Sequence, residues 1–165
     1  MLKETNAGRE VLAKFVADAM LGRLARWLRV LGYDTLYSAE ADDAALARQS
    51  RAEDRILLTR DRELAHRKGI LVLWIKSDRV EEQLSQVVSQ LGLASEDRFS
   101  RCIQCNVVLQ ELARPQAEGR VPPYVWTTQA RFRECPQCRR VYWRGTHWAR
   151  MEQTLQSAGW KPGED

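Results

Sequence analysis

Long apolar runs are missing from this sequence. The longest, from Ile70 to Ile75, is far shorter than the roughly 20 residues that cross a bilayer. A positively charged and apolar leader is missing as well, because the opening residues are polar. We therefore expect a cytoplasmic protein with no membrane partner and a frayed N-terminus over residues 1–13.

Histidine is scarce, and cysteine is absent before residue 102. The first part of the chain therefore offers few nucleophiles or bases besides carboxylates, and His66 lies in a polar turn where we expect it to be exposed. The 21 arginines outnumber the 5 lysines, and guanidinium groups suit bidentate contact with phosphate and stacking on bases. A GC-rich genome would give the same bias. The net charge of +4 comes from the part after residue 98, since opposite charges balance before it.

Four short β-prone segments alternate with four segments of helical periodicity in the first 93 residues. This alternation is typical of an α/β fold, in which right-handed crossovers give a parallel sheet with helices on both faces. We therefore expect a three-layer parallel sheet in a domain over residues 14–93, and a smaller unit over 99–165. The expected strands are 15–17, 35–37, 56–58 and 71–75, and the expected helices are 19–31, 44–53, 62–68 and 81–91.

Aspartates follow the first three predicted strands. Asp18 ends the first strand, Asp42 and Asp43 follow the second, and Asp61 follows the third. Capping of the next helix explains one of Asp42 and Asp43. Because parallel strands end at one edge of a sheet, we expect the four carboxylates to meet there as catalytic residues. Such acids repel one another unless a cation lies among them, so we expect Asp18, Asp43 and Asp61 to bind Mg²⁺ or Mn²⁺. The ion would activate water for attack on a phosphodiester.

Three arginines share one face of the helix that follows Asp18. They are Arg23, Arg26 and Arg29. A solvated helix face is the plain explanation of this stripe. The alternative is a row of phosphate-binding cations that starts beside the carboxylate, with Arg23 and Arg26 in contact with the substrate.

All four cysteines lie in two CxxC turns, Cys102–Cys105 and Cys135–Cys138. Two turns that use every cysteine predict a closed tetrahedral Zn²⁺ site with a structural role. A redox pair is the rival interpretation, while disulfides would need an oxidising compartment. We expect a zinc ribbon with strands at 107–112 and 139–143, a loop around Pro122 and Pro123, and a C-terminal helix capped by Thr146.

Arginines and aromatic side chains interleave in the ribbon segment. This mixture suits neutralisation of an RNA backbone and stacking of bases, and it equally suits aromatics that pack on the first domain. His147, at the start of the last helix, either bonds locally or lies near a scissile phosphate. The interleaved residues are Arg131, Arg133, Arg139, Arg140 and Arg144 with Trp126, Phe132, Tyr142 and Trp143.

Four motifs in fixed order resemble the Mut7-C family. They are FVADAMLGRLARWLRVLGYD at 15–34, LLTRD at 57–61, RCIQCN at 101–106 and YWRGTHW at 142–148. The resemblance runs from about residue 14 to residue 151. It implies a PIN-like ribonuclease domain with a C-terminal zinc ribbon.

The resemblance also assigns roles to residues. It implies an acidic site of Asp18, the Asp42/Asp43 pair and Asp61, with Thr59 and Arg60 in the same signature as Asp61, and zinc on the four cysteines. The nearest match to a further acid of PIN nucleases is Asp78, after the fourth strand.

Together these features predict a metal-dependent ribonuclease with RNA as its partner. The alternative is a non-catalytic zinc-ribbon protein that binds RNA or the ribosome, and a third possibility is a PIN-type toxin that acts on one tRNA. The sequence leaves the oligomeric state open. The residues expected to contact the substrate are Arg23, Arg26, Thr59, Arg60 and His147.

Overall fold

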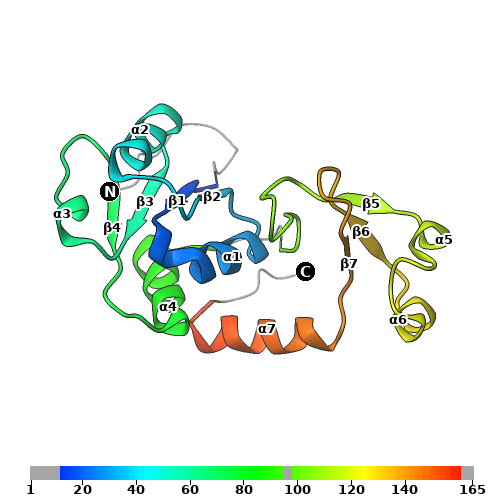
Figure 1. The fold of residues 1–165 in the computed structure, drawn as a ribbon. Helices are drawn as coiled ribbons and strands as arrows, with labels where there is room; N and C mark the ends of the chain where they lie inside the picture. The colour runs from blue at the N-terminus through cyan, green and yellow to red at the C-terminus, as the bar shows by residue number, and fades with distance from the viewer. Residues whose placement is uncertain (1–11, 95–97, 161–165) are drawn as a thin grey trace, which may run out of the picture.

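The computed structural model describes residues 12–94 and 98–160. It contains a four-stranded parallel sheet in the order β2-β1-β3-β4 and a three-stranded antiparallel sheet in the order β5-β6-β7 (Figure 1). The predicted α/β fold with a parallel sheet is therefore confirmed. The strands are β1 (Phe15–Ala17), β2 (Thr35–Tyr37), β3 (Ile56–Thr59), β4 (Val72–Trp74), β5 (Gln110–Leu112), β6 (Phe132–Glu134) and β7 (Val141–Tyr142).

The helices lie close to the predicted positions in the first 93 residues. A 3-10 turn, η1, precedes the first α-helix and takes up part of the segment predicted as one helix. Among the described residues, none of these helices is long and apolar enough to span a membrane. The helices of the described residues are η1 (Ala19–Leu21), α1 (Gly22–Val30), α2 (Asp43–Glu53), α3 (Arg62–Ala65), α4 (Val80–Leu91), α5 (Arg114–Ala117), α6 (Pro123–Thr128) and α7 (Thr146–Ser157).

Side chains of the parallel strands alternate between two apolar layers. Val16 and Leu57 pack with Leu46 of α2 and Leu64 of α3. Their neighbours along β1 and β3 point to the other face and join a larger core with α1, α4 and α7. This alternation has the period of two that extended backbone imposes, and it buries both faces of the sheet. The parallel sheet therefore lies between two helical layers, as predicted.

We call the segment after residue 98 that carries β5, β6 and β7 the ribbon. Helix α7 follows the ribbon and packs on the large core beside α4 (Figure 1). Met151, Leu155 and Trp160 are buried there, and Arg98 pairs with Glu152 at 3.1 Å. The sequence groups this helix with the ribbon segment 99–165, whereas its apolar side completes the core of the segment 14–93. The two units therefore share one hydrophobic core at this end of the chain.

The ribbon differs from its prediction in three details. The residues after Pro122, predicted as a loop, form α6, because Pro123 is at a first helical position where its fixed φ is favourable. Gly145 is the N-cap of α7, so Thr146 begins the helix instead of capping it. Strand β6 has no predicted counterpart, since two of its three residues, Arg133 and Glu134, are charged.

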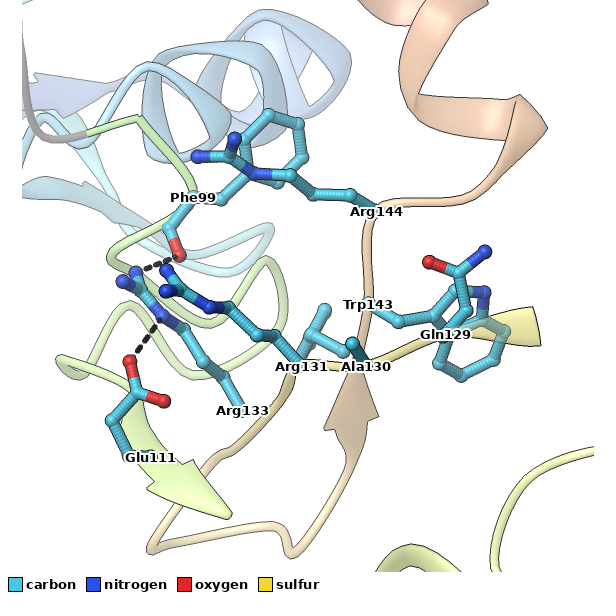
Figure 2. Close-up of a pocket in the computed structure, with 9 residues that line it drawn as sticks. Phe99, Glu111, Gln129, Ala130, Arg131, Arg133, Trp143 and Arg144 are labelled. Carbon is cyan, nitrogen blue, oxygen red and sulfur yellow. Dashed lines mark hydrogen bonds and ion pairs between the residues drawn. The ribbon is translucent and has the colours of Figure 1, made fainter. Parts of the chain in front are cut away.

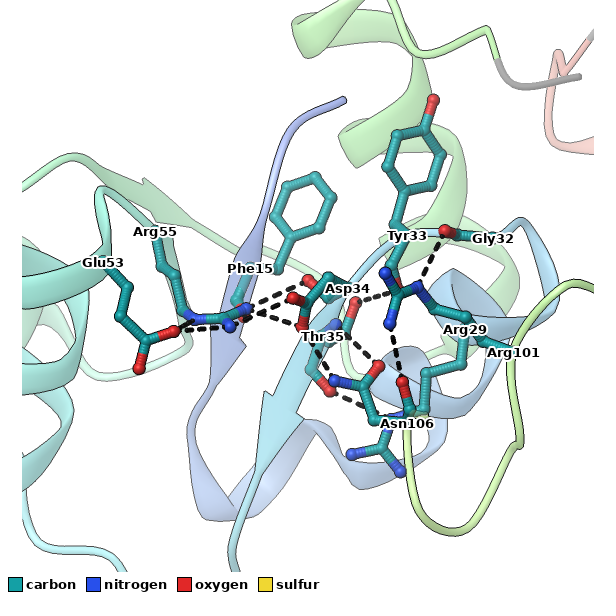
Figure 3. A network of polar contacts seen from close by, with 10 residues as sticks. All are labelled: Phe15, Arg29, Gly32, Tyr33, Asp34, Thr35, Glu53, Arg55, Arg101 and Asn106. Carbon is teal, nitrogen blue, oxygen red and sulfur yellow. Dashed lines mark hydrogen bonds and ion pairs between the residues drawn. The ribbon is translucent and has the colours of Figure 1, made fainter. Parts of the chain in front are cut away.

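The turn after the first CxxC docks on the edge strand β2 (Figure 3). Asn106 has a φ of 65° and a buried side chain. The Thr35 backbone N–H donates to Asn106 Oδ1 at 3.0 Å, and Asn106 Nδ2 donates to Asp34 Oδ1 at 2.7 Å. An edge strand leaves backbone groups without ladder partners, and the Asn106 amide satisfies one of them. The ribbon is therefore bonded to the first sheet.

Arg29 supports the same turn and corrects the prediction of a solvated arginine stripe. Its side chain is buried, with Nε donating to the Thr35 carbonyl at 2.9 Å and Nη1 to the Ile103 carbonyl at 2.8 Å. Arg23 and Arg26, earlier in α1, are exposed. The stripe turns inward at Arg29 because the first CxxC turn covers that end of the helix.

Asp34 links this contact to a buried ion pair (Figure 3). Arg55, with a side chain 5% exposed, donates to both carboxylate oxygens of Asp34 at 2.8 and 3.1 Å. Burial alone would raise the pKa of Asp34, but the hydrogen bonds from Arg55 and Asn106 hold this pKa below its usual 3.8. The Asp34 carboxylate therefore stabilises the folded state when it is ionised.

We expect Asp34→Asn to lower the free energy of unfolding at neutral pH by about 1.5–3 kcal/mol, because Arg55 loses a charged partner. Since the folded-state pKa is lowered, the contribution of Asp34 is fully present above the unfolded-state pKa and is lost as the pH falls through the folded-state pKa. The difference between wild type and variant, measured by urea unfolding, should shrink as the pH falls below about 4. The exposed Asp78→Asn is the control and should leave stability unchanged. A difference independent of pH would contradict the ionic role of Asp34.

Candidate functional site

The four cysteine sulfurs form a compact group in the ribbon. All four Sγ atoms lie within 4.8 Å of one another, and the Sγ atoms of Cys102 and Cys138 are 3.7 Å apart. Zinc–sulfur bonds of about 2.3 Å in a tetrahedron place sulfurs roughly 3.8 Å apart. The donor set therefore fits a structural Zn²⁺ ion, as the spacing predicts.

The two CxxC turns share one backbone geometry. In each turn the N–H of the second cysteine donates to the sulfur of the first at 3.4 Å. The residues that follow the turns, Asn106 and Arg139, have left-handed φ angles of 65° and 63°, and each donates its N–H to the carbonyl of the first cysteine at 2.9 Å. Donors that point at sulfur stabilise thiolates, which are the form that binds metal.

The surroundings of the sulfurs favour ionisation at one of them. Burial would raise the pKa of Cys102, but hydrogen bonds from the Tyr142 hydroxyl and two backbone N–H groups lower it to about 7. Burial and the neighbouring thiols raise the pKa of Cys105 to about 12. Burial also raises the pKa of Cys135. Four adjacent thiolates thus need a cation among them, which is the role of Zn²⁺ in such sites.

The acidic edge of the parallel sheet begins with Asp18. Its backbone N–H continues the ladder to Leu58 of β3 at 3.0 Å, and its side chain is only 7% exposed. Oδ1 accepts the Met20 N–H at 2.9 Å and caps η1, while Oδ2 accepts the Thr59 hydroxyl at 2.5 Å and the Arg60 N–H at 3.0 Å. The carboxylate is therefore held in one orientation by three donors.

Thr59 connects Asp18 to Asp61. The Thr59 side chain is buried, and its Oγ1 also accepts the Asp61 backbone N–H at 3.0 Å. Asp61 is exposed and caps α3 through Oδ1, which accepts the Glu63 and Leu64 N–H groups at 2.7 and 3.0 Å. In the TRD signature the Thr59 hydroxyl therefore links the Asp18 carboxylate to the Asp61 backbone. A contact between Thr59 and substrate stays a prediction.

Asp42 and Asp43 lie where the chain passes from β2 into α2. Asp42 is the N-cap and accepts the Ala45 N–H at 2.7 Å, and Asp43 is exposed in the first turn. In the described residues, the cysteines form the group of three or more His, Cys, Asp or Glu side chains close enough to hold a metal ion. The strand-end carboxylates are not gathered into a second such group, so metal binding by Asp18, Asp43 and Asp61 stays a prediction.

The predicted substrate-contact residues have different surroundings. Arg23 and Arg26 are exposed on α1, which follows Asp18 through η1. Arg60 is partly buried, and its Nε has no hydrogen-bond partner in the structure. His147 is in the first turn of α7, and its side chain lies outside the described part of the chain. Asp78, in the loop after β4, is exposed.

The sequence analysis missed a tryptophan that lies beside the acidic edge. Trp74 ends β4, donates its indole N–H to the Arg60 carbonyl at 3.3 Å and lies under the Arg62 guanidinium, 5.1 Å from the ring centroid. Trp74 and Arg62 line an open cavity of about 460 Å³ together with Ala65 and His66, which is exposed as expected. The sequence gives no signal for Trp74, because it reads as one more apolar residue of a buried strand.

These features define the class of the protein: an α/β protein with aspartates after three of its parallel strands and four cysteines positioned for a metal site. The chain belongs to the Mut7-C RNAse domain family, whose model matches residues 13–155 and so covers most of the sequence. The predicted family resemblance is confirmed, and membership supports a ribonuclease-type activity with RNA as substrate. Comparisons with curated proteins and with solved structures found no significant match.

We expect about one zinc ion per chain in the purified protein and almost none in Cys135→Ser, because a three-thiolate site cannot close. Structural zinc contributes on the order of 10 kcal/mol to the folding of such small units, so the ribbon of the variant should become sensitive to proteases. Elemental analysis and limited proteolysis measure these two effects. Tyr142→Phe keeps four thiols and the ring, and it should retain zinc. Full zinc content in Cys135→Ser would contradict the assignment.

Proposed function

We propose that this protein is a metal-dependent ribonuclease that hydrolyses RNA phosphodiesters at the acidic edge of its parallel sheet. Asp18, Asp43 and Asp61 would hold one or two Mg²⁺ or Mn²⁺ ions, with Asp42 assisting. The observation that carries the proposal is the hydrogen-bonded link from the Asp18 carboxylate through the Thr59 hydroxyl to the Asp61 backbone N–H, which connects the ends of two adjacent strands. Family membership supports RNA as the substrate.

The acids contribute in different ways. Asp18 is held by its three donors, whereas Asp61 and Asp43 are exposed, and both cap hydrogen bonds of Asp61 go to Oδ1. A bound Mg²⁺ or Mn²⁺ supplies activated water and stabilises charge on the phosphate. The exposed Arg23 and Arg26 follow Asp18 along α1, where they can neutralise backbone phosphates next to the one that is cleaved.

One observation favours a second candidate function. Both oxygens of Asp18 already accept hydrogen bonds from the protein, so this carboxylate is satisfied without an ion. The acids could then serve as helix caps in a non-catalytic protein that binds RNA or the ribosome through its ribbon. Such a protein would bind RNA with a steep salt dependence but would show no Mn²⁺ affinity that depends on Asp18.

We expect Asp18→Asn to reduce Mn²⁺-dependent RNA cleavage by about 10²-fold or more, because the amide keeps the acceptor for the Met20 N–H but loses the charge. Cleavage of a labelled RNA measures activity, and electron paramagnetic resonance measures bound Mn²⁺. Asp54→Asn is the matched control, since Asp54 is exposed at the left-handed C-cap of α2, a conformation that Asn accepts well. Equal cleavage by Asp18→Asn and wild type would end the catalytic assignment.

We expect Thr59→Val to lower kcat by about tenfold to a hundredfold with a smaller change in KM. Valine fills nearly the same space in the buried site but leaves Asp18 without its hydroxyl donor and the Asp61 N–H without its acceptor, so a positioning residue is lost. Thr59→Ser restores the hydroxyl and should recover most of the activity. A Thr59→Val variant that cleaves at the wild-type rate, or a Thr59→Ser variant as poor as valine, would contradict this role.

A further inference from the structure

A cavity of about 280 Å³ lies in the ribbon, and Tyr142 both lines it and contacts the sulfur of Cys102. It is bounded by β6, by the chain that continues β7 into α7, and by Phe99 of the segment that leads to the first CxxC turn (Figure 2). Its lining combines guanidinium groups with aromatic rings. Neither the cysteine centre nor the acidic edge includes these residues.

Three guanidinium groups line one side of this cavity. Figure 2 shows Arg131, Arg133 and Arg144 pointing toward Phe99. Arg133 forms a hydrogen bond and an ion pair within the protein: its Nη1 donates to the Phe99 carbonyl at 3.1 Å, and its Nε lies 3.4 Å from the Glu111 carboxylate. Arg131 and Arg144 are exposed, and Arg144 also interacts with other residues of the protein. Three cations thus face one carboxylate, and the cavity carries a net positive charge that suits an anionic ligand.

The opposite side of the cavity is aromatic. Trp143 lies there beside Gln129 (Figure 2), and the ring is partly buried against the small ribbon core. Tyr142, the preceding residue, contacts the sulfur of Cys102 at 3.1 Å. The metal centre therefore fixes the strand that presents Trp143. A ring held in this way offers a surface for a flat ligand without further ordering.

We propose that this cavity binds one nucleotide unit of a single RNA strand, with the phosphate between Arg131 and Arg144 and the base against Trp143. The inference rests on the proposed function for its choice of RNA as the ligand. Arginine on phosphate and an aromatic ring on a base are the paired contacts that single-strand binders use. A base can reach the ring only when it is unpaired, and the volume is at the lower end for small-molecule sites, so a duplex does not fit.

Binding is tested in the Asp18→Asn background, so that the probe is not cleaved. The probe is a fluorescein-labelled single-stranded oligouridylate, and affinity is measured by anisotropy at several salt concentrations. We compare Arg131→Ala/Arg144→Ala with Arg140→Ala/Arg150→Ala. The second pair removes the same charge from exposed positions that do not line the cavity.

The cavity pair should lose affinity on the order of tenfold and lower the salt slope by about 0.7, since the two arginines hold one phosphate and each phosphate contact with a single strand contributes roughly 0.7. The control pair should change both much less. Equal losses in the two pairs would show general attraction to a basic surface and overturn the proposal. An unchanged affinity in the cavity pair, or no binding by the parent, would overturn it as well. Zinc content and thermal melting verify that each variant folds.

A second readout locates the base directly. Ultraviolet cross-linking of an oligonucleotide that contains 4-thiouridine, followed by mass spectrometry, should mark Trp143 or Tyr142. Cross-links confined to the parallel-sheet domain would contradict the assignment. These results are independent of cleavage: loss of activity in Asp18→Asn concerns the acidic edge, whereas loss of binding in Arg131→Ala/Arg144→Ala concerns the cavity.

Discussion

The contact between the first CxxC turn and the start of β2 is the constraint on which the arrangement of the two sheets depends. Asn106 and Arg29 satisfy the N–H and the carbonyl of Thr35, and Arg29 also holds the turn by the Ile103 carbonyl. The left-handed φ of Asn106 arises from the geometry of the cysteine turn itself, and Arg139 repeats it in the second turn. The same backbone geometry that points the cysteines at one ion therefore places an amide against the edge of the parallel sheet.

This shared geometry couples the metal centre to the rest of the molecule. Strand β2 pairs with β1, which Asp18 follows directly, and the loop after β2 leads to Asp42. Arg55, just before β3, donates to the Phe15 carbonyl at the start of β1 and to both carboxylate oxygens of Asp34, just before β2. This buried ion pair therefore joins the starts of the three strands. A change in the cysteine group should therefore act on the Asn106 turn and on the edge of β2 as well as on the ribbon.

Sequence patterns predicted the parts of the fold that depend on local periodicity. Strands such as β3 are runs of apolar residues between polar ends, and the spacing of CxxC turns reflects the coordination of one ion. Hydrogen bonds between buried polar groups that are far apart in the sequence could not be predicted. Arg29 looks like Arg23 and Arg26 in sequence, yet it is buried because a turn more than 70 residues later covers it. Asn106 and Tyr142 carry no local signal for the same reason, and Trp74 is hidden in an apolar strand.

The strand-end acids show why a structural and a catalytic interpretation of one pattern need not compete. Asp18, Asp42 and Asp61 each accept a backbone N–H at the start of the next helical segment, which is the ordinary work of an N-cap. A carboxylate has about four acceptor positions, and a cap uses one or two of them. Capping fixes the direction of the remaining lone pairs at no further entropic cost. Capping thus holds three of these acids in place without using all of their acceptor positions, and the Thr59 hydroxyl adds a hydrogen-bonded link between the Asp18 carboxylate and the Asp61 backbone N–H.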